Sequence, residues 1–227
     1  MKNIILPLFI SFTTLSLTTA CNSPFNNYIE NTSGSKASPE LSSESKLIIE
    51  EYNSIILEFQ NIDDETETLK KLKSIIPKLK QINLEKERYR LLMNSYLRIG
   101  DIEKAYTLTE EILAQNKQPN IKNFQCMLME TLNKPSSLIK DCYSAAASLY
   151  QHELNKLDSS APNYTQILWG FNVNIFHAGH IEYRYQLKKI VDHQKNETDQ
   201  QFYKTLFDLE TNADLRQELL YSIASRI

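Results

Sequence analysis

From Tyr89 to Ala105 the chain reads YRLLMNSYLRIGDIEKA, and this stretch decides the fold. Its apolar and aromatic residues recur three or four positions apart, which is the spacing of one face of an α-helix. Gly100 interrupts the run, and a glycine there permits a tight turn between two helices. Ala105 is small enough to let the second helix approach the first closely. We therefore predict a helix pair at residues 86–99 and 101–116.

The same stretch resembles a tetratricopeptide repeat, a helix–turn–helix unit of about 34 residues. The aromatic, leucine, tyrosine, turn-glycine and alanine positions of that family correspond here to Tyr89, Leu92, Tyr96, Gly100 and Ala105. The resemblance implies that other helix pairs stack on this one, because a single repeat cannot bury its apolar faces alone.

The rest of the domain continues the helical spacing. Only four glycines occur in 227 residues, so strands joined by tight turns are disfavoured and an all-α fold is expected. A weaker copy of the turn occurs at Gly179–Leu187, displaced by 79 residues from Gly100–Leu108. That offset is not a multiple of the repeat length, so we predict an irregular, tetratricopeptide-like α-solenoid. Its nine or ten helices are expected as antiparallel pairs at 43–61/64–82, 86–99/101–116, 120–133/136–156, 162–178/180–195 and 197–210/213–227.

The N-terminus resembles the signal of a bacterial lipoprotein. An uncharged, apolar run occupies Ile4–Leu17, which suits a signal peptide and is shorter than the roughly 20 residues of a membrane-spanning helix. Thr19, Ala20 and Cys21 then match the end of a lipoprotein signal, in which the cysteine becomes the first mature residue and carries lipid such as palmitate. Ordinary secretory cleavage after Ala20 is the alternative, because the residues before that site are small.

This resemblance sets the expected domain boundaries and location. Residues 1–20 are the expected signal peptide, 21–45 a lipidated N-terminus with a disordered tether, and 46–227 the helical domain. The tether is rich in serine and asparagine, so it buries too little apolar surface to offset its ordering entropy. In Gram-negative lipoproteins the residue after the cysteine influences sorting, and Asn22 implies the outer membrane. We expect a lipid anchor on the periplasmic face of the cell outer membrane.

The cysteine count agrees with export. Three cysteines occur, and setting Cys21 aside leaves the pair Cys126 and Cys142 in a compartment that permits disulfides. The two residues lie at equal distances on either side of Lys134, in the turn between two predicted helices, so they should stand at similar height. A bridge would close a loop of about 17 residues and contribute roughly 3 kcal/mol. The alternative is a pair of buried free thiols.

An aromatic-rich stretch supplies the candidate binding residues. Tyr164, Trp169, Tyr183 and Tyr185 fall within it. Helical spacing predicts that most of these aromatics belong to the core. Some of the tyrosines, or the tryptophan, can instead line the concave face of a helical array, where such residues act as binding anchors.

Histidines near Gly179 raise the question of a metal. His177, His180 and Glu182 lie close together in sequence. Ligands on one helix need a spacing of three or four residues on one face, but here a predicted turn separates the histidines. We therefore expect no metal, no cofactor and no catalytic residue, and an enzyme that uses these side chains is the remote alternative.

Composition and motifs narrow the expected function. The net charge is −3 and no basic stripe occurs, so nucleic acid is not an expected partner. No nucleophile elbow, P-loop, zinc-peptidase motif or dinucleotide fingerprint is present, so the protein is not expected to be an enzyme. We expect an outer-membrane-anchored periplasmic lipoprotein that binds another protein, as a scaffold or as an assembly factor similar to the pilotins of envelope machinery. The alternative is an immunity lipoprotein that neutralises a toxin delivered into the periplasm.

Overall fold

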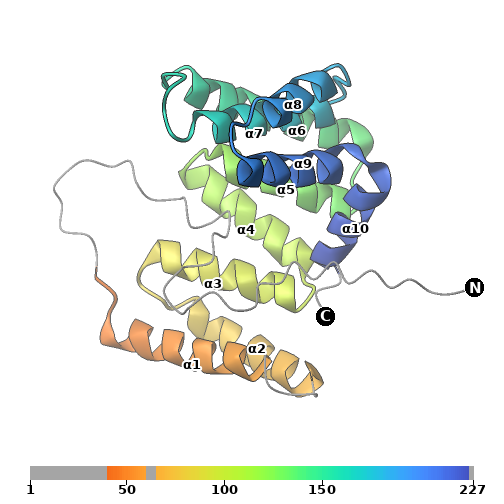
Figure 1. Cartoon of the computed structure of the whole chain (residues 1–227). Coiled ribbons are helices and arrows are strands. Elements are labelled where there is room, and N and C mark those ends of the chain that lie inside the picture. Colours follow the sequence, from red (N-terminus) through yellow and green to blue (C-terminus); the bar gives the residue numbers. More distant parts are fainter. Residues whose placement is uncertain (1–39, 60–64, 225–227) are drawn as a thin grey trace, which may run out of the picture. The chain divides into compact units, whose positions relative to one another are not determined.

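The computed structural model describes residues 40–59 and 65–224, which lie in one compact unit, Lys36–Ile227. These residues form ten α-helices and no strand, so the all-α fold class is confirmed (Figure 1). The expected signal peptide, Cys21 and most of the expected tether lie outside the described residues. The helices are α1 (Ser43–Phe59), α2 (Glu65–Leu79), α3 (Glu85–Arg98), α4 (Ile102–Gln115), α5 (Pro119–Thr131), α6 (Ser136–Leu154), α7 (Tyr164–His177), α8 (Tyr183–Asp192), α9 (Glu197–Thr211) and α10 (Ala213–Ala224).

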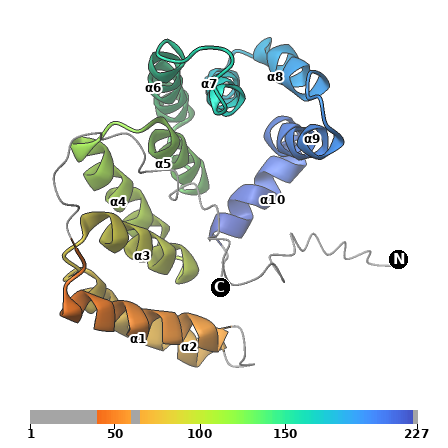
Figure 2. The ribbon, with the colours of Figure 1, turned by 60° about the vertical axis from the view of Figure 1, so that its left-hand side comes forward.

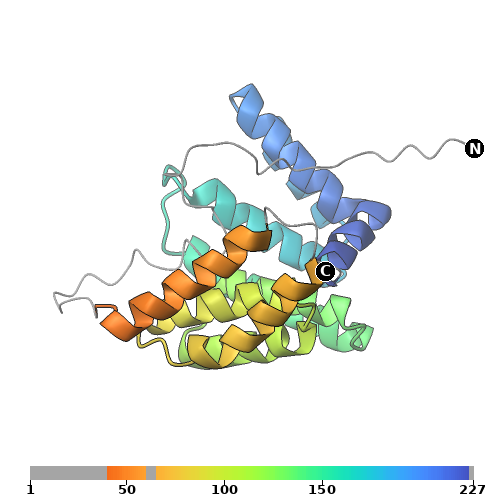
Figure 3. The same ribbon diagram turned by 90° about the horizontal axis from the view of Figure 1, so that it is seen from below.

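Each helix packs on the next one along the chain, from α1 to α10. Figure 2 shows this succession, from α1–α2 in orange to α9–α10 in blue, and Figure 3 shows the α1–α2 pair from below. Contacts between helices that are not consecutive break the order: α10 also packs on α5, and Trp169 of α7 packs on Tyr203 of α9. Repeats of a solenoid contact only their neighbours. The return of α10 onto α5 departs from that rule, so the tetratricopeptide-like solenoid stays a prediction.

The α3–α4 pair has the local geometry that its sequence predicts. Gly100 adopts a φ of +70°, in the left-handed region that glycine favours. Asp101 caps α4, because its carboxylate accepts a hydrogen bond of 3.2 Å from the backbone N–H of Lys104. Ala105 of α4 is fully buried. The other residues that resemble the repeat are also buried: Tyr89, Leu92 and Tyr96.

Small residues bring α6 and α7 close together. Ala146 and Ala147 of α6 are buried. Gly170 of α7 lies against the ring of Tyr150, so closely that a Cβ atom added to the glycine would lie 2.4 Å from Cε1. Glycine permits this close approach because it has no side chain. On α7, Trp169 and Val173 join a core cluster whose other buried members, Leu187, Ile190 and Val191, come from α8.

The connection between α7 and α8 is longer than the sequence predicted. The chain has a φ of +112° at Gly179, and α8 begins only at Tyr183. Two turns fill the gap, since Tyr183 donates its backbone N–H to His180 and Arg184 donates to Ile181, at 3.0 and 3.1 Å. The weaker copy of the α3–α4 turn therefore does not reproduce its short connection.

Candidate functional site

A cleft of about 1120 Å³ lies among α7, α8 and the first turn of α9. It exceeds the roughly 300–1,000 Å³ of ordinary small-molecule sites, so an extended segment or a bulky group fits it. Its lining residues are Tyr164, Thr165, Leu168, Asn172, Glu182, Tyr183, Tyr185, Gln186, Lys189, Ile190, His193, Gln194, Lys195, Asn196 and Asp199.

Tyrosines form the walls of this cleft. Tyr164 begins α7 and Tyr183 begins α8. Edge-to-face packing against Phe171, with ring centroids 6.1 Å apart, fixes the ring of Tyr183. Tyr185 keeps 63% of its surface exposed, and Lys189 Nζ lies 4.6 Å from the centroid of its ring. A lysine at that distance holds the ring by a cation–π contact.

The floor of the cleft is apolar and its rim is polar. Ile190 is buried and Leu168 is half-buried, while the side chain of Asn172 is buried and donates to the Leu168 carbonyl at 2.8 Å. Two carboxylates and two ammonium groups lie around the rim, so these four side chains carry no net charge: Glu182, Asp199, Lys189 and Lys195. Such a lining favours a neutral ligand with apolar groups over a polyanion or a polycation.

Three of the four candidate aromatics lie in this cleft. Tyr164, Tyr183 and Tyr185 line it, but Trp169 does not. Trp169 is only 8% exposed and packs on Tyr203 of α9, with ring centroids 5.2 Å apart. The tryptophan thus joins α7 to α9 below the cleft, as a core residue.

Sequence reasoning missed the polar lining. Asn172 of α7, Lys189 of α8 and Asp199 of α9 were not among the predicted site residues. The chain turn at residues 193–196 brings α9 back beside α8, and the spacing within either helix contains no information about that turn. The aromatic composition of the stretch was the only available indication.

A smaller hollow borders the residues that resemble the repeat. It measures about 380 Å³ and includes Tyr89, Leu92 and Tyr96 with the basic residues Lys80, Arg88 and Lys104. Two of these cations already have partners. Arg88 donates to the Ile82 carbonyl at 2.8 Å, and Lys104 pairs with Asp101. The cleft of α7, α8 and α9 is therefore the stronger candidate site.

A buried polar cluster joins α10 to three other helices. The guanidinium of Arg216 donates to Glu210 at 2.6 Å, to Glu130 at 2.8 Å and to the hydroxyl of Tyr143 at 2.7 Å. We call Glu130, Tyr143 and Glu210 the arginine site; they belong to α5, α6 and α9. Tyr143 also donates to Glu130 within the site. His177 of α7 lies 2.7 Å from Glu210, and the Arg216 side chain is 9% exposed.

The charges of this cluster are coupled. Burial by itself would raise the pKa of Glu210, but the hydrogen bond with His177 and the charge of Arg216 outweigh burial, and the pKa is lowered. Burial by itself would lower the pKa of Arg216, but the carboxylates around it raise that pKa. Burial raises the pKa of Tyr143 well above its ordinary value. Arg216 and Glu210 are therefore charged, and Tyr143 neutral, at neutral pH.

A disulfide lies next to the arginine site. Cys126 of α5 and Cys142 of α6 are joined, with an S–S distance of 2.10 Å and a Cα–Cα distance of 5.6 Å. This is the pair that the cysteine spacing predicted. Cys126 precedes Glu130 by one helical turn and Cys142 precedes Tyr143 directly, so the covalent link holds the two helices where they present these side chains.

The histidines near Gly179 are separated by their contacts. His177 is partly buried against Glu210, whereas His180 is 58% exposed and lies 3.3 Å from Glu182. Within residues 40–59 and 65–224, no group of three or more histidine, cysteine, aspartate or glutamate side chains is placed to hold a metal ion. The structure does not bring the three residues together as one site.

Comparison with known proteins gives no relative. No family model matches the chain, no curated protein matches it, and no solved structure matches it. Among the described helices, none is both long enough and apolar enough to cross a membrane.

Proposed function

We propose that this protein is an exported, lipid-anchored domain that binds another protein through the cleft of α7, α8 and α9. One observation carries the proposal: a cleft of about 1120 Å³ whose walls are Tyr164, Tyr183 and Tyr185. Tyrosine supplies large contact area at a low cost in conformational entropy, and it is enriched among the residues that dominate binding energy. Because the two carboxylates and two ammonium groups of the rim cancel in charge, the cleft suits a neutral segment with apolar side chains.

Two features support export and the anchor. The Cys126–Cys142 disulfide is typical of domains in oxidising compartments. In the N-terminal sequence, Thr19, Ala20 and Cys21 follow the apolar run Ile4–Leu17, as at the end of a lipoprotein signal. A lipid on Cys21 would hold the domain close to the membrane, which raises its effective concentration for partners in the envelope. By this proposal the protein is a scaffold or assembly factor at the periplasmic face of the outer membrane.

Partner capture tests the binding proposal. The full chain, the double variant Y183A/Y185A and the control L47A would each be used to recover partners from envelope extracts. Leu47 is 65% exposed on α1, so its loss changes an apolar surface outside the cleft. We expect one protein to be recovered by the wild type and by L47A and to be lost with Y183A/Y185A. Equal recovery with the double variant, or no partner with any chain, would refute the proposal.

The identity of that partner separates the two functional classes. A component of a secretion, pilus or other envelope assembly means a scaffold, and a toxin means an immunity protein.

Labelling with a palmitate analogue tests the anchor. We expect label and membrane association in the wild type and neither in C21S. Release of an unlabelled wild-type protein would instead indicate ordinary cleavage after Ala20.

A further inference from the structure

The cleft of α7, α8 and α9 presents hydrogen-bond donors that the fold itself does not use. Among the described residues, four lining side chains make no hydrogen bond within the protein: Tyr164, Tyr183, Tyr185 and Gln186. Each tyrosine hydroxyl and the glutamine amide can therefore donate to a ligand. A ligand that carries carbonyl oxygens would satisfy these donors along the tyrosine walls.

The carboxylates of the cleft, in contrast, are already engaged. Glu182 lies 3.3 Å from Nδ1 of His180, and Asp199 accepts a hydrogen bond of 2.5 Å from the side-chain amide of Asn196. A ligand with many N–H or O–H donors, such as an ordinary peptide backbone or a sugar chain, would compete with these contacts. The cleft therefore favours a ligand that is rich in acceptors and poor in donors.

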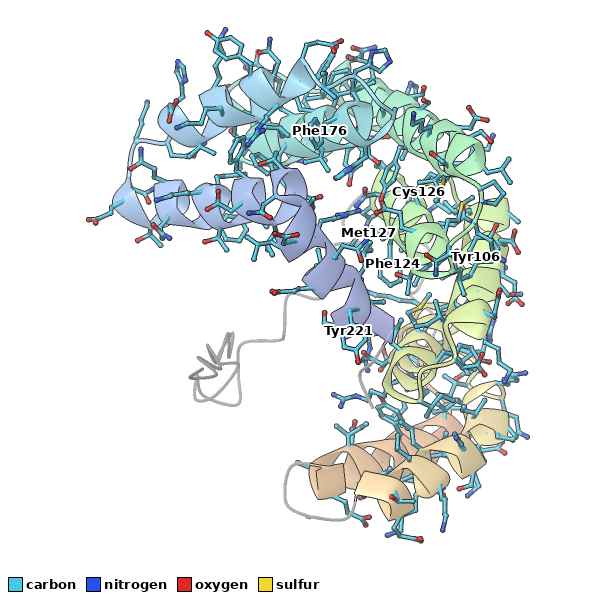
Figure 4. The ribbon with its side chains drawn as sticks, turned by 90° about the vertical axis from the view of Figure 1, so that its right-hand side faces the viewer. Tyr106, Phe124, Cys126, Met127, Phe176 and Tyr221 are labelled. Carbon is cyan, nitrogen blue, oxygen red and sulfur yellow. A yellow bond between two sulfur atoms is a disulfide. The ribbon has the colours of Figure 1, made fainter. Side chains whose placement is uncertain are left out.

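The cleft runs along the whole of α8. Four of its lining residues recur at helical spacing on one face of that helix: Glu182, Gln186, Lys189 and His193. Figure 4 shows α8, in pale blue, beside α7 and α9. A helix of 10 residues is about 15 Å long, which matches about five residues of a polyproline II segment at 3.1 Å each.

Three common modes of peptide recognition do not suit this lining. No strand occurs among the described residues, so a peptide finds no sheet edge to extend. Of the described lining residues, only Leu168 and Ile190 are aliphatic, which is too few for the apolar face of a docked helix, and none is an arginine that could bind an acidic motif. The remaining mode, in which a proline-rich segment packs on aromatic side chains, matches the tyrosine walls.

We propose that the cleft binds an uncharged, proline-rich segment of a partner protein in the polyproline II conformation. Proline has no backbone N–H, and polyproline II makes no internal hydrogen bonds, so such a segment offers carbonyl acceptors and few donors. The charges of the rim cancel, which favours a segment without net charge. The inference rests on the proposed function, because it names the chemistry of the segment that the cleft recognises.

Ligand binding to the full chain tests the proposal. The probes are a fluorescent peptide of four Ala-Pro-Pro repeats and a control peptide of four Ala-Ser-Gly repeats, which has the same length and no proline. A third probe is a chitin tetrasaccharide, an uncharged ligand with many O–H donors. The triple variant Y164F/Y183F/Y185F removes three donors and keeps the rings, and L47A is the control outside the cleft. Fluorescence anisotropy measures the peptides, and calorimetry measures the sugar.

We expect the wild type and L47A to bind the proline-rich peptide at least about tenfold more tightly than the control peptide, with no dependence on salt. The triple variant should bind it about tenfold more weakly than the wild type, because three hydrogen bonds are lost while the aromatic surfaces remain. Equal affinity for the two peptides, unchanged binding by the triple variant, or tighter binding of the tetrasaccharide would overturn the proposal.

Competition separates this inference from the proposed function. Added in excess, the proline-rich peptide should release the partner that the wild type recovers from envelope extracts. A partner that requires Tyr183 and Tyr185 but is not released by the peptide would refute the proline-rich segment and leave protein binding by the cleft in place. Peptide binding without any partner that requires these tyrosines would refute the proposed function and support the stated chemistry of the cleft.

Discussion

Replacing Gly170 by alanine tests the packing of α7 on α6. An added Cβ would lie 2.4, 2.5 and 2.9 Å from three ring carbons of Tyr150, all shorter than real Cβ contacts. The ring is 8% exposed and has little room to move. Overpacking of a core costs about 1–3 kcal/mol, and three contacts under 3.0 Å place this change near the top of that range. Alanine returns about 1 kcal/mol in helix propensity.

We therefore expect G170A to lower the free energy of unfolding by about 2 kcal/mol, or the melting temperature by about 4–8 °C for a domain of this size. Circular dichroism during thermal and urea unfolding measures both quantities. Y150L removes the ring, so the double variant G170A/Y150L should lose less stability than the sum of the single changes. Gly179 serves as the control, because its φ of +112° makes G179A costly through the backbone, without coupling to Y150L. A G170A protein as stable as the wild type would refute this account of the α6–α7 contact.

Three further predictions concern other parts of the fold. Reduction of the Cys126–Cys142 disulfide should lower the free energy of unfolding by about 3 kcal/mol, because the bond closes a loop with a sequence separation of 16. Thermal unfolding with and without reductant measures this loss, and identical curves would contradict the prediction. The lowered pKa of Glu210 adds stability that is complete above the unfolded pKa of about 4.3 and is lost as the pH falls through the folded value. The wild type should therefore be more stable than E210Q at neutral pH, and the difference should narrow below about pH 4; a difference that is constant with pH excludes this role. Ala105 of α4 is fully buried, so A105L should cost about 1–3 kcal/mol by overpacking. A neutral effect in urea unfolding would show that the core around Ala105 is loosely packed.

Local sequence patterns predict the helices well, whereas contacts between residues far apart in sequence determine how the helices pack. The spacing of apolar residues places all ten described helices within a few residues of their ends, and Gly100 locates the turn between α3 and α4. The α10–α5 contact could not be predicted, because Arg216 and Glu130 are 86 residues apart and charged residues are normally expected at the surface.

The candidate site, too, was predictable only in the part that local sequence determines. Aromatic composition singled out the stretch that contains the cleft, and the tyrosines at the starts of α7 and α8 line it. Trp169 stands among them in sequence, but it points into the core toward Tyr203 of α9. Whether an aromatic side chain on α7 is exposed or buried depends on which helix packs over it. The sequence of α7 contains no information about the position of α9, so the burial of Trp169 could not be predicted.

The polar cluster explains how a helix with few buried apolar residues keeps one position on α5. A buried ion pair contributes little net stability, since the desolvation of its charges offsets their attraction. It discriminates strongly between arrangements, however, because a shift of α10 by one turn would leave Glu130 and Glu210 without Arg216. The half-buried leucines of α10 would tolerate such a shift far better. The cluster therefore fixes the register of α10 on α5.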